Sequence, residues 1–404
     1  MSAEGELAMP DPVNRPPSDP ALFLTNGHAV EVAAAPLDPI ARRRADIDAK
    51  QARVAEILTD LGCEGVVLLV PAHVAWFCGG INVRGLIAET ERPGVYTNGK
   101  SRWVIGSNID TQRIFDEELD RLGFQLKEWP WSTGRAVLLG ELTTGKKIAA
   151  DRPFPNLPLI NERLRTEIRP LMPSDRERYL ALGRDVAHAV EATARSLNPG
   201  DPESEVAGHL AHRLFRHGIE SAGLSIATGR KGERYRRSGF TEAAVEGFAT
   251  LQATGTRDGL YVTVSRSIAF GTIPDNHKAE YDAASRVSAL CRAMSTPQQT
   301  IGAAGEAGRK MLHNGPFEFE WRQSQPGYGT GWLPAEELRR MGQDEKLVAH
   351  QAVVWQTRIG ATAVVDTVLV SEAGPIPVTP PSDWPFKRIR VKDVAIDVPD
   401  VLVR

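Results

Sequence analysis

The chain has 404 residues, of which 42% are hydrophobic and 25% are charged, and its formal net charge at pH 7 is -3. This composition is typical of a globular protein, and the length favours two domains. The small net charge gives no long-range attraction to nucleic acid or to a membrane surface, so we expect neither as a partner. The sequence has no run of 18 or more apolar residues, which argues against a transmembrane helix.

Two further features favour a cytoplasmic location. The first twenty residues, MSAEGELAMPDPVNRPPSDP, have neither the basic start nor the apolar core of a signal peptide. The three cysteines, Cys63, Cys78 and Cys291, are far apart and odd in number, which argues against a disulfide framework and against a paired-cysteine zinc site. We therefore expect a cytoplasmic protein with reduced thiols.

The N-terminal part of the sequence divides into an arm and a domain. Residues 1–38 are rich in proline and alanine without periodicity, which predicts a flexible arm or a strap over a neighbouring subunit. Residues 39–172 are typical of an α/β domain. A helix from Pro39 to Gly62 is followed by a strand at GVVLLV, a turn at Pro71, strands at RWVIG and KKIAA, and a helix at TQRIFDEELDRLG between those two strands.

Residues 173–404 predict a second domain of long strands flanked by helix pairs. Ser174 is the expected cap of its first helix, and Asp201-Pro202 begins the next one. The expected elements are helices at about 174–197, 278–295 and 301–313, strands near 223–228, 247–254, 259–269, 351–358 and 362–370, and a proline-rich tail. Helix pairs around mainly antiparallel strands favour an α+β fold over a doubly wound sheet.

The order of these elements resembles that of the creatinase, prolidase and aminopeptidase P superfamily. The resemblance covers nearly everything from about residue 40 to residue 404. It rests on VVLLVPAHVAWFCGG in the first domain and on LNPGDPESEVAGHL, GLYVTVSRSIAFG, PGYGTGWLPAEE and VVDTVLVSEAG in the second. It implies a pita-bread C-terminal domain preceded by a smaller creatinase-type α/β domain, and it implies a homodimer.

Metal-dependent members of this superfamily hold two divalent ions with two aspartates eleven positions apart, one histidine in a glycine-rich turn, and two late glutamates. In this sequence the five positions fall on Gln252, Thr263, Tyr328, Gln356 and Val365. Neutral amides and hydroxyls cannot offset the dehydration of two adjacent dications. We therefore expect no dinuclear metal site, no metal ligands and no cofactor.

Creatinase, a member of the same superfamily, cleaves a C–N bond without a metal ion and uses a histidine four residues before a threonine. In this sequence the threonine is Thr241 and the residue four before it is Arg237. The creatinase glutamate falls on Ser265, next to Arg266, and the second family histidine falls on Ala335. An arginine stays protonated and cannot shuttle protons as a histidine does, so the creatinase mechanism does not carry over.

The cavity implied by the resemblance is rich in hydrogen-bond donors and has lost its acids. Tyr328, Arg237 and His350 are its candidate catalytic residues, with Tyr328 as an acid or donor and His350 as a general base; for Tyr328 and His350 a packing role is the alternative. The candidate substrate-binding residues are Gln252, Thr263, Ser265, Gln356 and Arg358. Arginines suit a carboxylate or phosphate ligand, and the alternative is that Asp258 or Asp366 pairs with them.

Three functions remain open on this basis. The first is a metal-independent, hydrolase-like enzyme that acts on the C–N bond of a small amino-acid-like or amide substrate, with an anionic ligand. The second is a catalytically inactive homologue that binds a peptide or a protein. The third is an Xaa-Pro metallo-aminopeptidase, which the residues at the five ligand positions contradict.

Overall fold

The structure is a computed structural model. It describes residues 38–82, 91–154, 156–323, 325–335 and 344–404. The arm expected over residues 1–38 lies outside these ranges apart from Asp38, the cap of the first helix. None of the helices in the described ranges is long and apolar enough to cross a membrane.

The N-terminal α/β domain is built on a five-stranded sheet with the strand order β4-β3-β2-β1-β5. Its elements are α1 (Pro39–Leu61), β1 (Gly65–Leu68), α2 (Pro71–Phe77), β2 (Gly94–Thr97), β3 (Arg102–Ser107), β4 (Gln125–Trp129), α4 (Arg135–Thr143), β5 (Ile148–Ala150) and α5 (Asn161–Ile168). Strand β1 lies at the second position from the edge and is buried along its whole length. Helix α1 ends where predicted, because Gly62 takes a left-handed conformation (φ 59°) that closes the last turn.

One local prediction for this domain is wrong, and another is only partly right. Pro71 begins helix α2 instead of forming a turn, because proline fits the first helical position and the carboxylate of Asp151 accepts hydrogen bonds from the backbone N–H groups of Leu69 and Val70. The helix expected after β3 is reduced to α3 (Thr111–Arg113) and a short π-helical segment (Ile114–Glu118). The chain then turns, with positive φ at Arg121 and Gly123.

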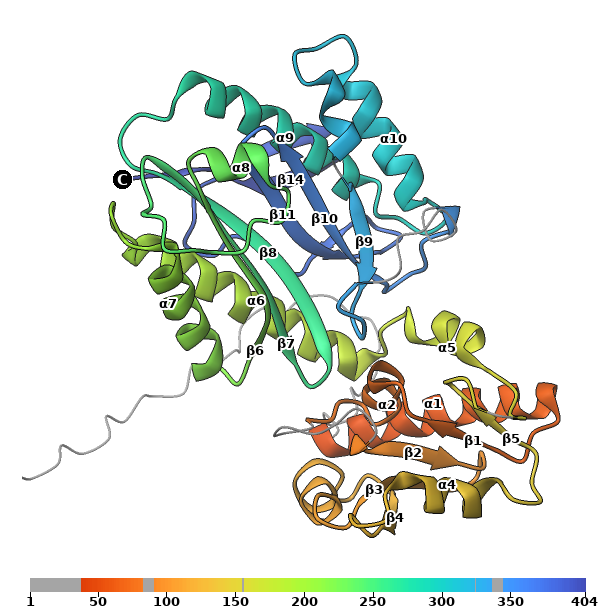
Figure 1. Cartoon of the computed structure of the whole chain (residues 1–404). Coiled ribbons are helices and arrows are strands. Elements are labelled where there is room, and N and C mark those ends of the chain that lie inside the picture. The colour runs from red at the N-terminus through yellow and green to blue at the C-terminus, as the bar shows by residue number, and fades with distance from the viewer. Residues whose placement is uncertain (1–37, 83–90, 155, 324, 336–343) are drawn as a thin grey trace, which may run out of the picture. The chain divides into compact units, whose positions relative to one another are not determined.

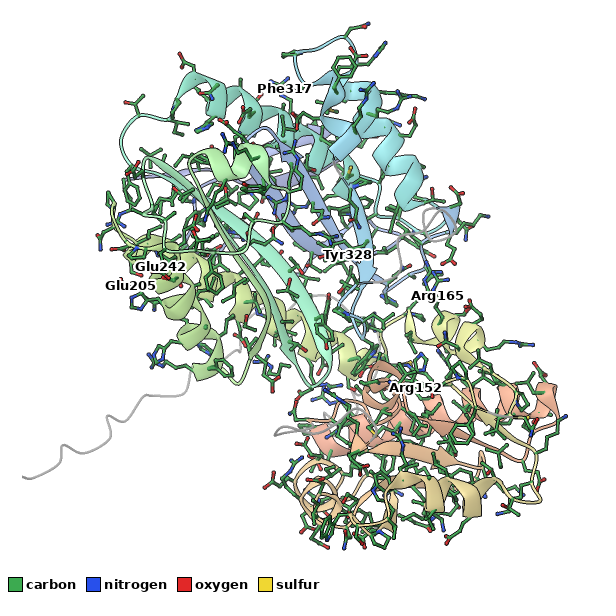
Figure 2. The ribbon with its side chains drawn as sticks, viewed as in Figure 1. Arg152, Arg165, Glu205, Glu242, Phe317 and Tyr328 are labelled. Carbon is green, nitrogen blue, oxygen red and sulfur yellow. The ribbon has the colours of Figure 1, made fainter. Side chains whose placement is uncertain are left out.

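The C-terminal domain contains two four-stranded sheets (Figure 1). The strand order of the first sheet is β15-β8-β7-β6 and that of the second is β12-β11-β10-β9. The strands are β6 (Glu220–Thr228), β7 (Phe248–Arg257), β8 (Leu260–Ala269), β9 (Gly327–Thr330), β10 (Ala352–Ile359), β11 (Thr362–Leu369), β12 (Ile376–Pro377) and β15 (Leu402–Val403). Strand β9 carries Tyr328 (Figure 2).

Strands β8 and β11 hold the two sheets together through side-chain hydroxyls. The Thr367 hydroxyl donates to the backbone oxygen of Thr263 (2.7 Å) and accepts from its backbone N–H (3.2 Å). The Ser265 hydroxyl accepts from the backbone N–H of Val365 (2.9 Å). Strands β8 and β11 belong to different sheets, so these side-chain hydrogen bonds join the two strands in place of backbone pairing.

Helices cover the outer faces of both sheets. Helix α6 (Pro173–Ser196) packs on β7 and β8, and α9 (Asp275–Ala293) packs on β10 and β11 (Figure 1). The remaining helices are α7 (Glu203–Arg216), α8 (Arg230–Arg234) and α10 (Ile301–Leu312). This arrangement leaves the inner faces of the two sheets to form a cavity.

Two predictions for this domain are also wrong. Ser174 does not cap helix α6, which begins one residue earlier; its backbone N–H and its hydroxyl both donate to Asp46 of helix α1, which supplies the cap from a distant part of the chain. The tail is not merely proline-rich, since it forms a hairpin of β13 (Phe386–Val391) and β14 (Val394–Pro399).

A fully buried ion pair links helices α1 and α6. The ammonium of Lys50 lies 2.7 Å from Asp175 Oδ2, and neither side chain has any exposed surface. The ammonium also lies over the rings of Trp76 (5.9 Å) and Trp332 (5.1 Å), while Arg178 lies 2.8 Å from the other Asp175 oxygen. Burial lowers the pKa of Lys50, and Asp175 opposes this shift.

Candidate functional site

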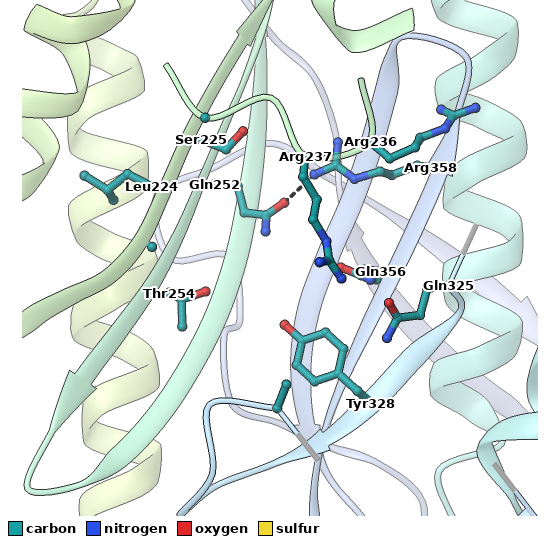
Figure 3. A pocket seen from close by; sticks show the side chains of 13 residues that line it. Leu224, Ser225, Arg236, Arg237, Gln252, Thr254, Gln325, Tyr328, Gln356 and Arg358 are labelled. Atoms are coloured by element: carbon teal, nitrogen blue, oxygen red, sulfur yellow. Dashed lines mark hydrogen bonds between the residues drawn. The ribbon is translucent and has the colours of Figure 1, made fainter. Parts of the chain in front are cut away.

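A cavity of about 550 Å³ lies between the inner faces of the two sheets. Its walls come from strands β6, β7, β9 and β10 and from the segment that follows helix α8 (Figure 3). The size is that of a site for a small organic molecule, and each of the four strands contributes at least one polar side chain to the lining.

The wall formed by β7 follows directly from strand geometry. Successive side chains of a strand point to opposite faces, so Gln252 and Thr254 both face the cavity. Their neighbours Leu251 and Ala253 are fully buried on the other face, on which α6 packs. The alternation of polar and apolar residues in this strand therefore builds the core and the cavity wall together.

Strand β10 supplies Gln356 and Arg358 by the same alternation. The guanidinium of Arg358 donates from Nη2 to Gln252 Oε1 (2.7 Å), which joins the two walls (Figure 3). Burial, with a smaller effect from the neighbouring Arg236, lowers the pKa of Arg358 to about 10. Arg358 is therefore charged at neutral pH.

Tyr328 enters the cavity from β9, and its hydroxyl lies 3.4 Å from Thr263 Oγ1. Burial raises the pKa of Tyr328, while the hydrogen bond to Thr263 and the charges of Arg237 and Arg358 oppose the shift. The hydroxyl therefore keeps its proton at neutral pH and can donate a hydrogen bond.

Two further arginines reach the cavity from the segment after α8. Arg236 donates to the carboxylate of Glu320 and to the backbone oxygen of Gly360. Arg237 is exposed and points into the cavity between Gln252 and Gln356 (Figure 3). Arg237 has no hydrogen-bond or ion-pair partner among the residues that the structure describes, so its charge is available to a ligand.

A buried carboxylate anchors this segment. Glu203, at the start of α7, has no exposed side-chain surface and accepts hydrogen bonds from the Lys231 ammonium and from the Thr241 backbone N–H and hydroxyl. Lys231 and Thr241 lie on either side of the arginines in the sequence. The anchor therefore fixes both ends of the stretch that carries Arg236 and Arg237.

No protein-family model matches the sequence, and a search of curated proteins finds no match either. Solved structures do match. The prolidase from Pyrococcus horikoshii OT3 matches with a TM-score of 0.70 at 14% identity, over 83% of this chain and 99% of that one. The chain has the prolidase fold. The Xaa-Pro dipeptidase from Bacillus anthracis matches at 15% identity with a TM-score of 0.69, over 89% of this chain and 100% of that one.

The same prolidase fold occurs in a protein of another kind. The N-terminal domain of the FACT complex subunit SPT16 from chickpea (Cicer arietinum) matches at 10% identity with a TM-score of 0.60, over 85% of this chain and 97% of that one. The α+β prediction and the predicted pair of an α/β domain and a pita-bread domain are thus confirmed. At these identities the similarity establishes the fold and leaves the activity to the site itself.

The cavity does not fit the dinuclear metal centre that the resemblance to metallopeptidases implies. Gln252, Tyr328 and Gln356 line it, and none of them carries a carboxylate or an imidazole. The guanidinium of Arg358, itself a cation, donates to the Gln252 oxygen that a metal ion would need. Across the described ranges, no group of three or more histidine, cysteine, aspartate or glutamate residues is placed to hold a metal ion.

The structure brings together five of the eight predicted site residues in this cavity: Arg237, Gln252, Tyr328, Gln356 and Arg358. Thr263 and Ser265 lie behind the lining and are buried. Thr263 contacts Tyr328 and shares a hydrogen bond of 2.9 Å with Thr254, so it supports the wall without forming it.

His350 does not line the cavity, contrary to the sequence-based expectation. It lies two residues before β10, in a turn with positive φ (66°), and is not among the lining residues. There the imidazole lies 2.9 Å from the guanidinium of Arg176. Partial burial and the charge of Arg176 lower the pKa of His350. The structure gives His350 no place in the chemistry of the cavity.

The two aspartates considered as partners for the cavity arginines are engaged elsewhere. Asp366 pairs with Arg266 (3.1 Å) and Arg292 (3.4 Å), because its side chain points to the opposite face of β11 from the cavity. Asp258 accepts a hydrogen bond from Asn82 (3.0 Å) and lies 3.6 Å from Arg178. The alternative in which these acids neutralise Arg237 or Arg358 is therefore wrong.

Sequence reasoning missed several lining residues. Thr254 could have been found, because it stands two positions after Gln252 in the same strand. Arg236 was visible in the sequence, since it stands directly before Arg237. Nothing in the sequence indicated that Gln325 and Ser225 line the cavity. Gln325 lies in the loop before β9 and Ser225 in the edge strand β6, and their positions depend on how these two segments pack around the cavity.

Proposed function

We propose that the cavity binds a small organic anion, an amino-acid derivative or amide that carries a carboxylate, and that it does so without a metal ion. One observation supports this most strongly. Arg237 and Arg358 line the cavity, and the described lining contains no aspartate or glutamate that could neutralise them. Arginine is well suited to hold a carboxylate in a forked contact.

A thermal-shift screen of small carboxylates against chelator-treated protein tests this proposal. A ligand at 100 times its Kd should stabilise the folded protein by about 2.7 kcal/mol. Arg237→Gln should weaken binding by about 10- to 100-fold, since a hydrogen bond to a charged group contributes roughly 1.5–3 kcal/mol. Arg163→Gln is the control, because Arg163 is an exposed arginine of α5 that pairs with Asp60.

Two results would contradict the proposal. In the first, Arg237→Gln binds every ligand of the screen as tightly as the wild-type chain does. In the second, the stabilisation disappears after chelation and returns with a divalent metal. Arg237 is exposed, so its replacement is expected to leave the fold intact and to report on binding alone.

A second candidate is a metal-independent, hydrolase-like enzyme that cleaves a C–N bond of the bound compound. Tyr328 favours it, because its protonated hydroxyl lines the cavity and could donate to the departing nitrogen. Tyr328→Phe should then abolish release of the amine product and leave ligand affinity within about threefold. If a tightly bound ligand is recovered unchanged from the wild-type protein, the chain acts as a binding module.

A further inference from the structure

We propose that the ligand is a small dicarboxylate or an N-acylated acidic amino acid, with two negative charges and no free amino group. This inference rests on the proposed function and specifies the class of compound that the cavity takes. It follows from the balance of charges and from the hydrogen-bonding groups of the lining.

The charge balance calls for a dianion. Among the described residues three arginines line the cavity, and Arg236 is paired with Glu320 (2.5 Å). Arg358 donates to the neutral amide of Gln252, and Arg237 has no partner among the described residues. Within the described part of the chain two positive charges are thus left without a carboxylate, and a ligand with two carboxylates would match them.

The same balance disfavours an ammonium group. A free amino acid is protonated at neutral pH and would place a third positive charge beside Arg237 and Arg358. The described lining has no aspartate or glutamate to accept its hydrogen bonds. Peptide-like compounds with a free amino terminus are disfavoured for the same reason.

The remaining groups suit neutral polar atoms of a ligand. Gln325 and Gln356 each present an amide, which can donate to a carbonyl oxygen and accept from an amide N–H. The nitrogen Nε2 of Gln325 is buried and has no hydrogen-bond partner among the residues that the structure describes. An acyl group on the ligand nitrogen removes its charge and supplies a carbonyl oxygen for such a donor.

Titration calorimetry with four compounds tests the inference on the full chain. Glutarate, N-acetylglutamate and glutamate share a five-carbon dicarboxylate skeleton and differ in the amino group, which is absent, acylated or free. We expect glutarate and N-acetylglutamate to bind at least tenfold more tightly than glutamate. Inorganic phosphate is the fourth compound, and it should bind more weakly than glutarate because it has no carbon chain to pack in the cavity and carries no carboxylates.

A variant should narrow this preference. Gln356→Glu keeps the size of the side chain and places a carboxylate in the cavity, so the ratio of the glutamate Kd to the glutarate Kd should fall at least tenfold. Arg163→Gln, far from the lining, should leave the ratio unchanged. The wild-type ratio decides the matter by itself if the Gln356 variant does not fold.

The outcomes separate this inference from the proposed function. Glutamate binding as tightly as glutarate, with both weakened by Arg237→Gln, would overturn the inference and leave the proposed function standing. Phosphate binding more tightly than glutarate would overturn the assignment to dicarboxylates. No binding by any of the four compounds at 10 mM would overturn the inference, while the proposed function would be decided by the wider screen of carboxylates.

Discussion

Replacing Asp175 by asparagine should destabilise the folded protein by about 3–5 kcal/mol, the usual cost of leaving one buried charge unpaired. Asp175 and Lys50 have no exposed side-chain surface, and the ammonium lies 2.7 Å from the carboxylate. The variant leaves the ammonium beside the rings of Trp76 and Trp332 without its closest counter-ion. Lys50→Met should cost less, because Asp175 would keep its contact with Arg178.

The pH dependence of the variant has a definite sign. Burial holds the pKa of Lys50 in the folded protein below its ordinary value of 10.5, so the unfolded chain binds more protons in the window between the two pKa values. The free energy of unfolding therefore rises with pH through that window. Asp175→Asn removes the group that opposes the shift, so the rise should begin at a lower pH than in the wild-type protein.

Urea unfolding followed by tryptophan fluorescence measures both effects. The control is Asp60→Asn, which removes an exposed pair with Arg163 at 3.3 Å and should cost about 0–1 kcal/mol. A free energy of unfolding for Asp175→Asn within about 1 kcal/mol of the wild-type value would refute the reasoning. So would a loss of stability, relative to the wild-type protein, that does not shrink as the pH rises.

Two further predictions concern a packing contact and a tyrosine. Gly183→Ala should destabilise the protein by about 1–3 kcal/mol, because a Cβ there would lie 2.1 Å from the Val378 backbone oxygen. Gly208→Ala is the control: a Cβ there meets open space, so this substitution in helix α7 should stabilise the protein by about 0.5–1 kcal/mol in the same urea assay. Burial raises the pKa of Tyr328, so the stability that its protonated hydroxyl contributes is lost as the pH rises above 10. Tyr328→Phe should therefore reduce the fall in unfolding free energy in this pH range, while replacement of the exposed Tyr235 by phenylalanine should not. Equal slopes for the two variants between pH 9.5 and 11 would count against the second prediction.

The sequence predicted the main strands and helices because their periodic patterns reflect burial. Strands β7, β8, β10 and β11 appear within three residues of the expected bounds, and helices α1, α6, α9 and α10 do as well. The hairpin of β13 and β14 was missed, although FKRIRV alternates charged and apolar residues. The prolines just before it are typical of irregular chain and mask this short alternation. The predicted homodimer, cytoplasmic location and domain boundary at residue 172 stay predictions.

The candidate site was less predictable than the fold. Strand alternation places Gln252, Gln356 and Arg358 on cavity walls, so their positions could be deduced from the strands that carry them. His350 could not be placed, because it lies in a turn with positive φ before β10 and its contact with Arg176 has no signature in the sequence. The pairing of Arg236 with Glu320 joins residues 84 positions apart and had no signature in the sequence.

The anchor at Glu203 has a consequence for how this protein could vary. The carboxylate of Glu203 in helix α7 holds the segment that carries Arg236 and Arg237. A replacement at position 203 would therefore make the positions of both arginines less fixed, without altering any group that lines the cavity. Ligand preference in proteins of this kind could thus drift through changes outside the cavity, and a comparison confined to lining residues would overlook them.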